Sequence, residues 1–225
     1  MNNLISKALL VIVALFCFHP QKSMASDVIF DAVMTFCKGK ACKSGAFYYH
    51  FEKNVEGYCA GIKYIKSKPA IVSRAGFVEF KVKDAGLPAS ITLLPLVESS
   101  YDPNQESSAG AAGMWQLKAS TARDIGLVVD SSVDERFSVA ESTDGAIRYI
   151  KWLMGKFDGD IDLAIIAYNA GIGRVQRLID EYGTRNPWLI AKGLLKGKEA
   201  EHYLARYYGY SLAMYAEGVC DENEQ

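Results

Sequence analysis

The sequence lacks an excess of positive charge. Its 25 lysine and arginine residues are matched by 26 acidic residues, and the net charge at pH 7 is −1. Proteins that bind nucleic acid neutralise phosphates with clustered basic side chains, and nothing in this sequence resembles such a basic field. The charge balance therefore excludes nucleic acid as an expected partner.

Runs of alternating polar and apolar residues, which predict strands, are also missing, as are repeats and low-complexity stretches. Apolar residues recur instead at three- and four-residue steps, which indicates helices almost throughout. Half of the residues are hydrophobic, enough for a packed core. The sequence therefore predicts an all-α fold. The expected helices are 48–66, 69–84, 88–98, 120–126, 139–157, 160–170 (the central buried helix), 174–182 and 199–216.

Proline and glycine are placed where they predict local breaks. Pro88 is expected to begin the helix that carries Glu98, and Pro95 to kink that helix one turn before Glu98, because proline removes a backbone donor. Residues 99–112 are predicted to form a loop, since an Asp-Pro-Asn turn and Gly110 lie within them.

An apolar run long enough to span a membrane is absent near the N-terminus. Residues 1–25 instead have the pattern of a secretory signal peptide: the apolar core 8–18 is too short for a span, and residues 23–25 are suited to cleavage. Cys17 follows the bulky Phe16, which disfavours lipid attachment. The sequence predicts a periplasmic or secreted protein without a stable membrane anchor.

Cysteine is scarce, and four residues follow the signal peptide: Cys37, Cys42, Cys59 and Cys220. An even number in an oxidising compartment suggests two disulfides with three possible connectivities. The spacing of Cys37 and Cys42 suits a local bridge, which would leave Cys59 to reach Cys220 and staple the two ends. A zinc site is the weaker alternative, because the spacing is irregular and the three histidines do not cluster with the thiols. No metal is expected.

Glu98 is the strongest candidate for catalysis by residue chemistry. It ends the apolar run 91–97 and precedes a polar, glycine-punctuated stretch. Desolvation at the edge of an apolar element favours the protonated carboxyl, so Glu98 is suited to act as a general acid near neutral pH. None of the other nearby carboxylates, Asp102, Glu106, Asp134 and Glu135, is expected to be catalytic. Asp102 is predicted to cap a turn, and Asp134 and Glu135 to belong to a structural ion-pair cluster with Arg136.

Four segments, in this order and spacing, carry a resemblance to a known family: 94–100, 107–116, 133–136 and 167–171. Over about residues 86–215 the chain resembles the catalytic domain of soluble lytic transglycosylases, and it looks most like the membrane-bound branch that carries LysM repeats. Glu199 and Tyr203 fit the last family motif less closely. No LysM repeat is found in the sequence, so the glycan affinity that such repeats supply is expected to be missing.

The resemblance implies a lysozyme-like helical domain at residues 69–217. Residues 26–68 are expected to form a short helical extension stapled to that domain by a disulfide, and residues 218–225 an acidic tail.

The resemblance also implies roles for individual residues. Glu98 matches the family's single catalytic glutamate, which serves first as acid and then as base. The residues that would bind or position the substrate are Ser107, Met114, Gln116, Lys118, Tyr168, Asn169 and Tyr203. Asn169 has a structural alternative, a hydrogen bond to backbone near a helix end. The family commonly has a methionine at the position of Lys118, so this lysine would introduce a cation if it faces the substrate.

The function implied is an exported peptidoglycan lytic transglycosylase that needs no cofactor. It would cleave the bond between N-acetylmuramic acid (MurNAc) and N-acetylglucosamine (GlcNAc) of glycan strands and leave a 1,6-anhydro end. Two alternatives remain open at this point. One is a goose-type lysozyme that hydrolyses the same bond with the same glutamate. The other is a non-catalytic glycan-binding protein with the same fold.

Overall fold

The computed structural model describes residues 45–194, 197–216 and 219–220. The predicted signal peptide, the cysteines Cys37 and Cys42, the side chain of Glu199 and most of the predicted acidic tail lie outside the described residues.

The predicted all-α fold class is confirmed. The α-helices are α3 (Gly45–Lys66), α4 (Pro69–Asp84), α5 (Leu94–Ser99), α6 (Ala119–Asp124), α7 (Val139–Lys156), α8 (Ile161–Ala170), α9 (Ile172–Tyr182), α10 (Pro187–Gly193) and α11 (Gly197–Tyr215). Two 3₁₀ helices, η1 (Ala89–Leu93) and η2 (Glu135–Phe137), join them. Within the described ranges the only sheet is a two-stranded antiparallel hairpin of β1 (Ala111–Ala112) and β2 (Leu117–Lys118), with Ala112 opposite Leu117.

The segment before Glu98 differs from the predicted kinked helix. Residues 89–93 form the 3₁₀ helix η1, and a separate α-helix, α5, begins at Leu94. Pro95 therefore lies in the first turn of α5, where a backbone N–H has no partner inside the helix in any case. The proline begins the helix that carries Glu98 and does not bend a longer one.

Helix α10 was not predicted, although its start signal is present in the sequence. The side chain of Asn186 accepts hydrogen bonds from the backbone N–H groups of Trp188 and Leu189, and Pro187 occupies the first helical position. An asparagine cap followed by proline is a typical helix start. The helix has only 7 residues, too few for a clear apolar period.

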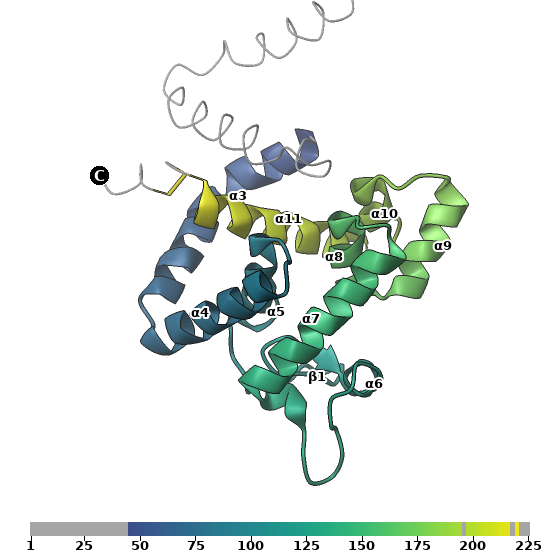
Figure 1. Cartoon of the computed structure of the whole chain (residues 1–225). Coiled ribbons are helices and arrows are strands. Elements are labelled where there is room, and N and C mark those ends of the chain that lie inside the picture. The colour runs from purple at the N-terminus through teal and green to yellow at the C-terminus, as the bar shows by residue number, and fades with distance from the viewer. Residues whose placement is uncertain (1–44, 195–196, 217–218, 221–225) are drawn as a thin grey trace, which may run out of the picture.

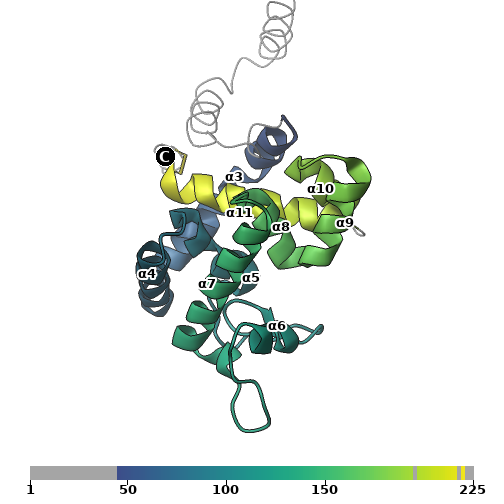
Figure 2. The ribbon, with the colours of Figure 1, turned by 45° about the vertical axis from the view of Figure 1, so that its right-hand side comes forward.

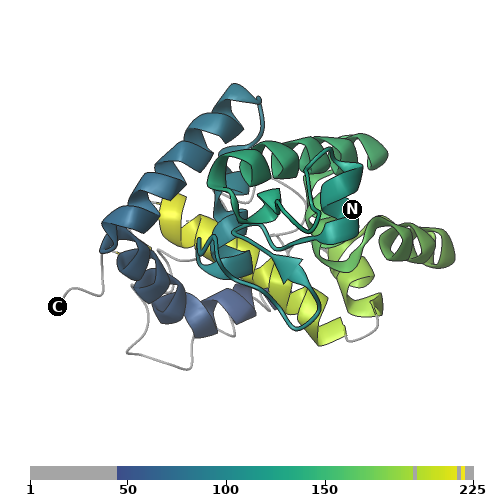
Figure 3. The ribbon, with the colours of Figure 1, turned by 90° about the horizontal axis from the view of Figure 1, so that it is seen from below.

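Helix α8 is buried as predicted, and α11 is the element around which the others gather. Residues 162–167 of α8 are all buried. Helix α11 packs against α3, η1, α5, α8 and α10. Figure 1 shows α3 alongside α11, and Figure 3 shows α11 crossing the middle of the molecule between α3 and the later helices. The core is thus organised around a helix from the end of the chain.

Two glycines allow α3 and α11 to approach closely. A Cβ added at Gly209 of α11 would lie 2.4 Å from the ring of Tyr58, and one added at Gly61 of α3 would lie 2.9 Å from the ring of Tyr210. Each glycine therefore accommodates a tyrosine of the opposite helix. The rings of Tyr58 and Tyr210 meet edge-to-face with centroids 5.0 Å apart, a favourable arrangement for aromatic pairs.

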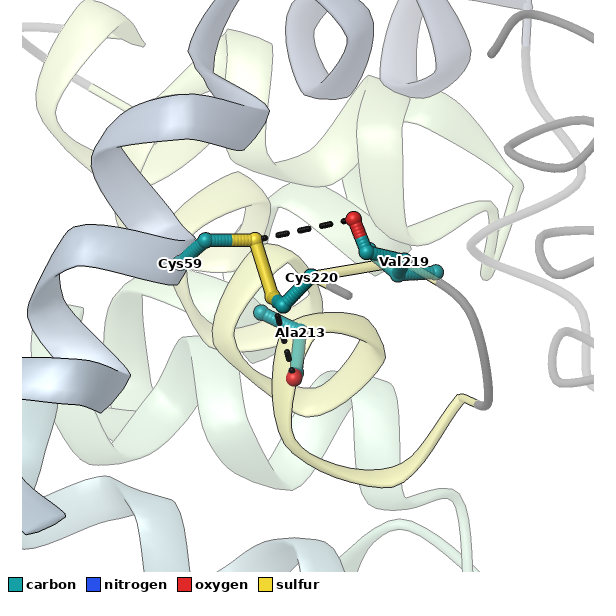
Figure 4. Close-up of a disulfide and its surroundings, with 4 residues drawn as sticks. All are labelled: Cys59, Ala213, Val219 and Cys220. Atoms are coloured by element: carbon teal, nitrogen blue, oxygen red, sulfur yellow. Dashed lines mark hydrogen bonds between the residues drawn. A yellow bond between two sulfur atoms is a disulfide. The ribbon is translucent and has the colours of Figure 1, made fainter. Parts of the chain in front are cut away.

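A disulfide also ties α3 to the C-terminal end of the chain, as predicted for Cys59 and Cys220. The two Cα atoms are 5.4 Å apart, and 161 positions separate the residues in sequence (Figure 4). A bridge that closes so long a loop restricts the unfolded chain strongly, by about 5 kcal/mol in the loop-entropy model. The bridge and the glycine contacts act on the same pair of segments.

We expect Gly209→Ala to lower the free energy of unfolding by about 1–3 kcal/mol, because the new methyl group overlaps the buried Tyr58 ring. Gly57→Ala is the matched control. Gly57 lies in α3 with no atom near its missing Cβ, so alanine should stabilise the protein by about 0.5–1 kcal/mol. Thermal or urea unfolding of both variants measures the difference, and equal effects would contradict close packing at Gly209.

Candidate active site

Glu98 lies in the last turn of α5, at the boundary between core and solvent. The preceding residues Leu94, Pro95, Leu96 and Val97 are buried, whereas Glu98 is partly exposed. The chain then turns sharply through two non-glycine residues with positive φ, Ser100 at 55° and Tyr101 at 62°. Such backbone angles cost free energy and occur often at functional sites. Here the Tyr101 side chain holds the turn: it is buried, and its O–H donates to the carbonyl of Thr92.

Two side chains of α11 contact the end of α5. The O–H of Tyr203 donates to Oε1 of Glu98 at 2.5 Å, and Nη2 of Arg206 donates to the carbonyl of Val97 at 3.2 Å. Tyr203 and Arg206 are one turn apart and so lie on the same face of the helix. Helix α11 thus positions both the carboxyl group and the backbone beside it.

Burial dominates the protonation of Glu98. Desolvation raises the pKa of Glu98 from 4.5 to about 7, against the hydrogen bond from Tyr203 and the positive charge of Arg206, which both lower it. The low-dielectric surroundings disfavour the carboxylate more than these two groups favour it. A substantial fraction of Glu98 is therefore protonated at neutral pH, as the sequence predicts for a general acid.

Residues 113–116 form a tight turn that passes close to α5. Gly113 has φ +76°, and a Cβ at that position would lie 1.7 Å from the carbonyl oxygen of Arg136. Only glycine fits there, because any side chain would overlap the backbone of Arg136. Gln116, at the other end of the turn, has φ 48°. The backbone of this segment is therefore closely determined at both ends.

Three helices hold this turn by hydrogen bonds. Oγ of Ser99, beside Glu98 on α5, donates to the carbonyl of Met114 at 2.8 Å. The indole N–H of Trp115 donates to Oγ1 of Thr143 on α7 at 3.0 Å. The O–H of Tyr168 on α8 donates to the carbonyl of Trp115 at 2.6 Å. The turn consequently connects the separate helices around Glu98.

The predicted ion pair of the 133–136 segment supports the hairpin. Arg136 pairs with Asp134 at 2.7 Å, and its Nη1 donates to the carbonyls of Gly110 and Leu117 at 2.9 and 3.1 Å. The side chain of Glu135 accepts from the backbone N–H of Val128. Asp134 and Glu135 are therefore occupied by structural contacts, in agreement with the sequence analysis.

Ser107 and Gln116 are tied into the loop before the turn. Oγ of Ser107 accepts from the backbone N–H of Ala111 at 3.0 Å, so its own O–H can still donate to a ligand. The side-chain nitrogen of Gln116 donates to the carbonyls of Gln105 and Gly113 at 3.1 and 2.9 Å. Gln116 thus fixes the loop through these two hydrogen bonds, and its predicted role in binding or positioning the substrate stays a prediction.

The remaining predicted residues divide by exposure. The side chain of Met114 has no exposed surface, so the prediction that it binds substrate directly does not fit the structure; it packs in the core. Lys118 and Asn169 are exposed. The side chain of Asn169 makes no hydrogen bond within the described part of the chain. The alternative prediction, a hydrogen bond from Asn169 to the backbone near the helix end, therefore does not fit the structure. Burial raises the pKa of the Tyr168 and Tyr203 phenols, and the charge of Glu98 raises both further, which places both phenols close to Glu98.

The other carboxylates predicted to be non-catalytic do not contribute to the environment of Glu98. Asp102 caps a turn by accepting from the backbone N–H of Asn104 at 2.9 Å, and Glu106 is exposed in the loop. In the described ranges no group of three or more histidine, cysteine or acidic side chains is arranged to hold a metal ion. The described helices also include none that is both long and apolar enough to cross a membrane.

Sequence reasoning missed Arg206. Its signal was the helical spacing with Tyr203 and Tyr207, which places all three on one face of a helix. Arg206 donates to the carbonyl of Val97, which lies 109 positions earlier in the chain. A single sequence does not show which distant segment a helix face will contact.

Comparisons with known proteins find relatives of this sequence. Residues 77–191 match the family model described as "Transglycosylase SLT domain". The chain is 43% identical over 131 residues to the membrane-bound lytic murein transglycosylase D of Escherichia coli (strain K12). The aligned region covers 58% of this chain and 29% of that protein. It is 39% identical over 79 residues to the peptidoglycan transglycosylase gp16 of Escherichia phage T7, covering 35% and 6% of the two chains. The chain thus spans less than a third of the length of these curated relatives.

Among solved structures, an inactive mutant of the lytic transglycosylase Slt from Pseudomonas aeruginosa is similar with a TM-score of 0.49 and 24% identity, over 60% of this chain and 22% of that one. The family match includes Glu98 and residues 113–116 but ends before α11, the helix that contributes Tyr203 and Arg206.

The raised pKa of Glu98 predicts a pH-dependent stability cost. The folded protein keeps a proton that the unfolded chain loses between pH 4.5 and about 7, so stability falls as the pH rises through this window. Glu98→Gln removes the buried charge. At pH 8 it should be more stable than the wild type by up to about 3 kcal/mol, and at pH 4 the difference should vanish.

Melting temperatures of the wild type and Glu98→Gln at pH 4 and pH 8 measure this effect. Glu181→Gln, at an exposed position in α9, is the control and should not show it. A Glu98→Gln variant no more stable than the wild type at pH 8 would contradict the burial of the charge.

Proposed function

The chain belongs to the Transglycosylase SLT domain family, and on this premise we propose that it is a lytic transglycosylase that cleaves peptidoglycan glycan strands between MurNAc and GlcNAc. The observation that carries the proposal is the environment of Glu98, a partly exposed carboxyl whose pKa of about 7 allows it both to give and to take a proton near neutral pH.

In the first step Glu98 acts as the acid. Its proton passes to the glycosidic oxygen as the bond from that oxygen to C1 of MurNAc breaks, and GlcNAc leaves with a hydroxyl group. The N-acetyl group of MurNAc stabilises the positive charge that develops at C1. The hydrogen bond from Tyr203 leaves one oxygen of Glu98 engaged with protein and orients the carboxyl for transfer.

In the second step the Glu98 carboxylate acts as the base. It takes the proton of the C6 hydroxyl of the same MurNAc while the C6 oxygen bonds to C1, which closes the 1,6-anhydro ring and restores protonated Glu98. No water is consumed. An attacking group within the same sugar has a high effective concentration, so the reaction needs no site for a nucleophilic water.

The neighbours of Glu98 support a mechanism with one carboxylate. The protein groups that shift its pKa are Tyr203 and Arg206, and neither carries a carboxyl group. Glycosidases that work with two carboxylates place the second one within about 5–10 Å of the first. Participation by the N-acetyl group removes the need for that second residue.

The remaining roles are part of the same proposal. Ser107, Lys118 and Asn169 bind the glycan, because each retains a polar group that is free to contact a ligand. Residues 1–25 direct export to the periplasm or beyond and are removed. Residues 26–68 extend the catalytic domain of residues 69–217, and the α3 part of this extension acts indirectly on Glu98 by supporting α11.

Purified sacculi provide the direct test of the reaction. Mass spectrometry of the wild-type products should find 1,6-anhydro-MurNAc ends without reducing MurNAc ends. Glu98→Gln should lower the rate of product release by about 10²- to 10⁴-fold, the usual contribution of a general acid, while Glu181→Gln should remain active. Reducing MurNAc ends alone would identify a hydrolase, and full activity of Glu98→Gln would refute the assigned mechanism.

Tyr203→Phe tests the hydrogen bond to Glu98. Because this bond lowers the pKa of Glu98, its loss should move the alkaline limb of the kcat profile to higher pH. The loss of orientation should lower kcat by about 10- to 100-fold. Tyr215→Phe is the control, because the Tyr215 O–H donates to the carbonyl of Ala89 and not to Glu98. This variant should leave the alkaline limb of the kcat profile in place. An unshifted alkaline limb in Tyr203→Phe would argue against Glu98 as the group that titrates.

A further inference from the structure

Three aromatic side chains form a row that begins at the turn beside Glu98 and ends on the outer surface of α7. The rings of Tyr168 and Tyr149 lie with centroids 5.5 Å apart. The rings of Tyr149 and Trp152 are nearly parallel, at 16°, with centroids 5.9 Å apart. Figure 2 shows α7 and α8, which supply these residues, side by side. The row therefore crosses from one helix to the next without a break.

The inner and outer ends of the row differ in environment. Tyr168 donates its O–H to the carbonyl of Trp115 in the turn beside α5. Trp152, at the outer end, is 46% exposed, whereas Trp115 is fully buried. Exposed apolar surface that is contiguous with other apolar groups can mark a binding site, and the Trp152 ring is contiguous with that of Tyr149. The structure thus offers a platform that is continuous with the candidate active site.

One cation lies over the outer end of the row, and two others are exposed on the same helix. Nζ of Lys156 lies 5.4 Å from the centroid of the Trp152 ring, and Arg148, Lys151 and Lys156 are all exposed on the same helix. Asp144 pairs with Lys81 at 2.6 Å, and Asp158 pairs with Arg185 at 3.0 Å. Asp124 also lies near this surface, since burial and then the Asp124 charge raise the pKa of Tyr149. A protein with a slight net negative charge thus has a local positive surface beside Trp152.

We propose that Trp152 and Tyr149, with Lys151 and Lys156, form an additional subsite for a peptidoglycan strand, separate from the residues that act on the cleaved bond. The proposal rests on the proposed function, because the row leads to the site of that reaction. The occupant is a sugar of the same strand together with the carboxylates of its stem peptide.

The chemistry of the occupant matches both parts of the surface. The C–H groups on one face of a pyranose ring pack against an aromatic ring, and an indole offers a large and rigid surface for this contact. Stem peptides carry free carboxylates, which exposed lysines attract in a manner that salt weakens. The subsite consequently increases affinity for long, peptide-bearing strands and leaves the chemical step unchanged.

The test separates this subsite from catalysis by using binding as well as turnover. Co-sedimentation with purified sacculi is measured in the inactive Glu98→Gln background. There Trp152→Ala should weaken binding by about two- to tenfold, the range that corresponds to one aromatic contact, and Trp152→Phe should restore most of it. Phe80→Ala, which removes an aromatic ring that is 67% exposed on α4, should leave binding unchanged.

The charge contribution is measured with the same assay. Lys151→Gln combined with Lys156→Gln should weaken binding to intact sacculi and reduce its dependence on salt. Binding to glycan strands stripped of their peptides should not change. The control pair, Lys66→Gln with Lys83→Gln, replaces exposed lysines elsewhere and should have no effect. In the active protein, Trp152→Ala should raise the half-saturating concentration of sacculi while kcat on a short peptide-free oligosaccharide stays the same.

The outcomes distinguish the two proposals. If sacculi are cleaved but Trp152→Ala binds and turns over like the wild type, the subsite is wrong and the reaction stands. If nothing is cleaved and binding still depends on Trp152, the subsite stands and the reaction is wrong. A protein that neither binds nor cleaves sacculi overturns both, and an equal loss in Phe80→Ala overturns the assignment to α7.

Discussion

The contact between α11 and the end of α5 is the constraint on which the site depends. Tyr203 holds the carboxyl group of Glu98, and Arg206 holds the carbonyl that precedes it. Helix α5 has only 6 residues, and so short a helix is not stable alone. Its position is therefore set by the neighbouring helix. That neighbour is supported in turn by α3, through the glycine–tyrosine contacts and the disulfide between Cys59 and Cys220.

The turn at residues 113–116 is the second element that brings distant segments together. It accepts hydrogen bonds from Ser99 and Tyr168 and donates one to Thr143, so α5, α7 and α8 are all connected through it. Its form depends on Gly113, which lies against the backbone of Arg136. Two residues of the turn that were predicted to bind or position the substrate maintain its shape. Met114 packs in the core and Gln116 secures the loop.

Most helices could be predicted from the sequence, because their apolar periods and end signals are local. Gly171 ends α8 with φ 88°, and Asp160 caps its start, as the chain pattern indicates. The errors occur where local signals were weak or ambiguous. Pro95 was expected inside a helix, although it is equally suited to the first turn of a new one. The short α10 was overlooked despite its asparagine and proline, since 7 residues carry little periodicity.

The sequence left the connectivity of its cysteines open, but it determined by itself the helical class and the acidic group at the edge of an apolar run. These features are recorded in residue types and in spacings of a few positions. Only the tertiary structure decided that Arg206 supports Glu98 from the far end of the chain, that Met114 is buried and that Trp152 continues a row of rings from Tyr168. The physical reason is that burial and side-chain contact depend on which helix faces lie together, and segments far apart in the sequence become neighbours only when the core has formed.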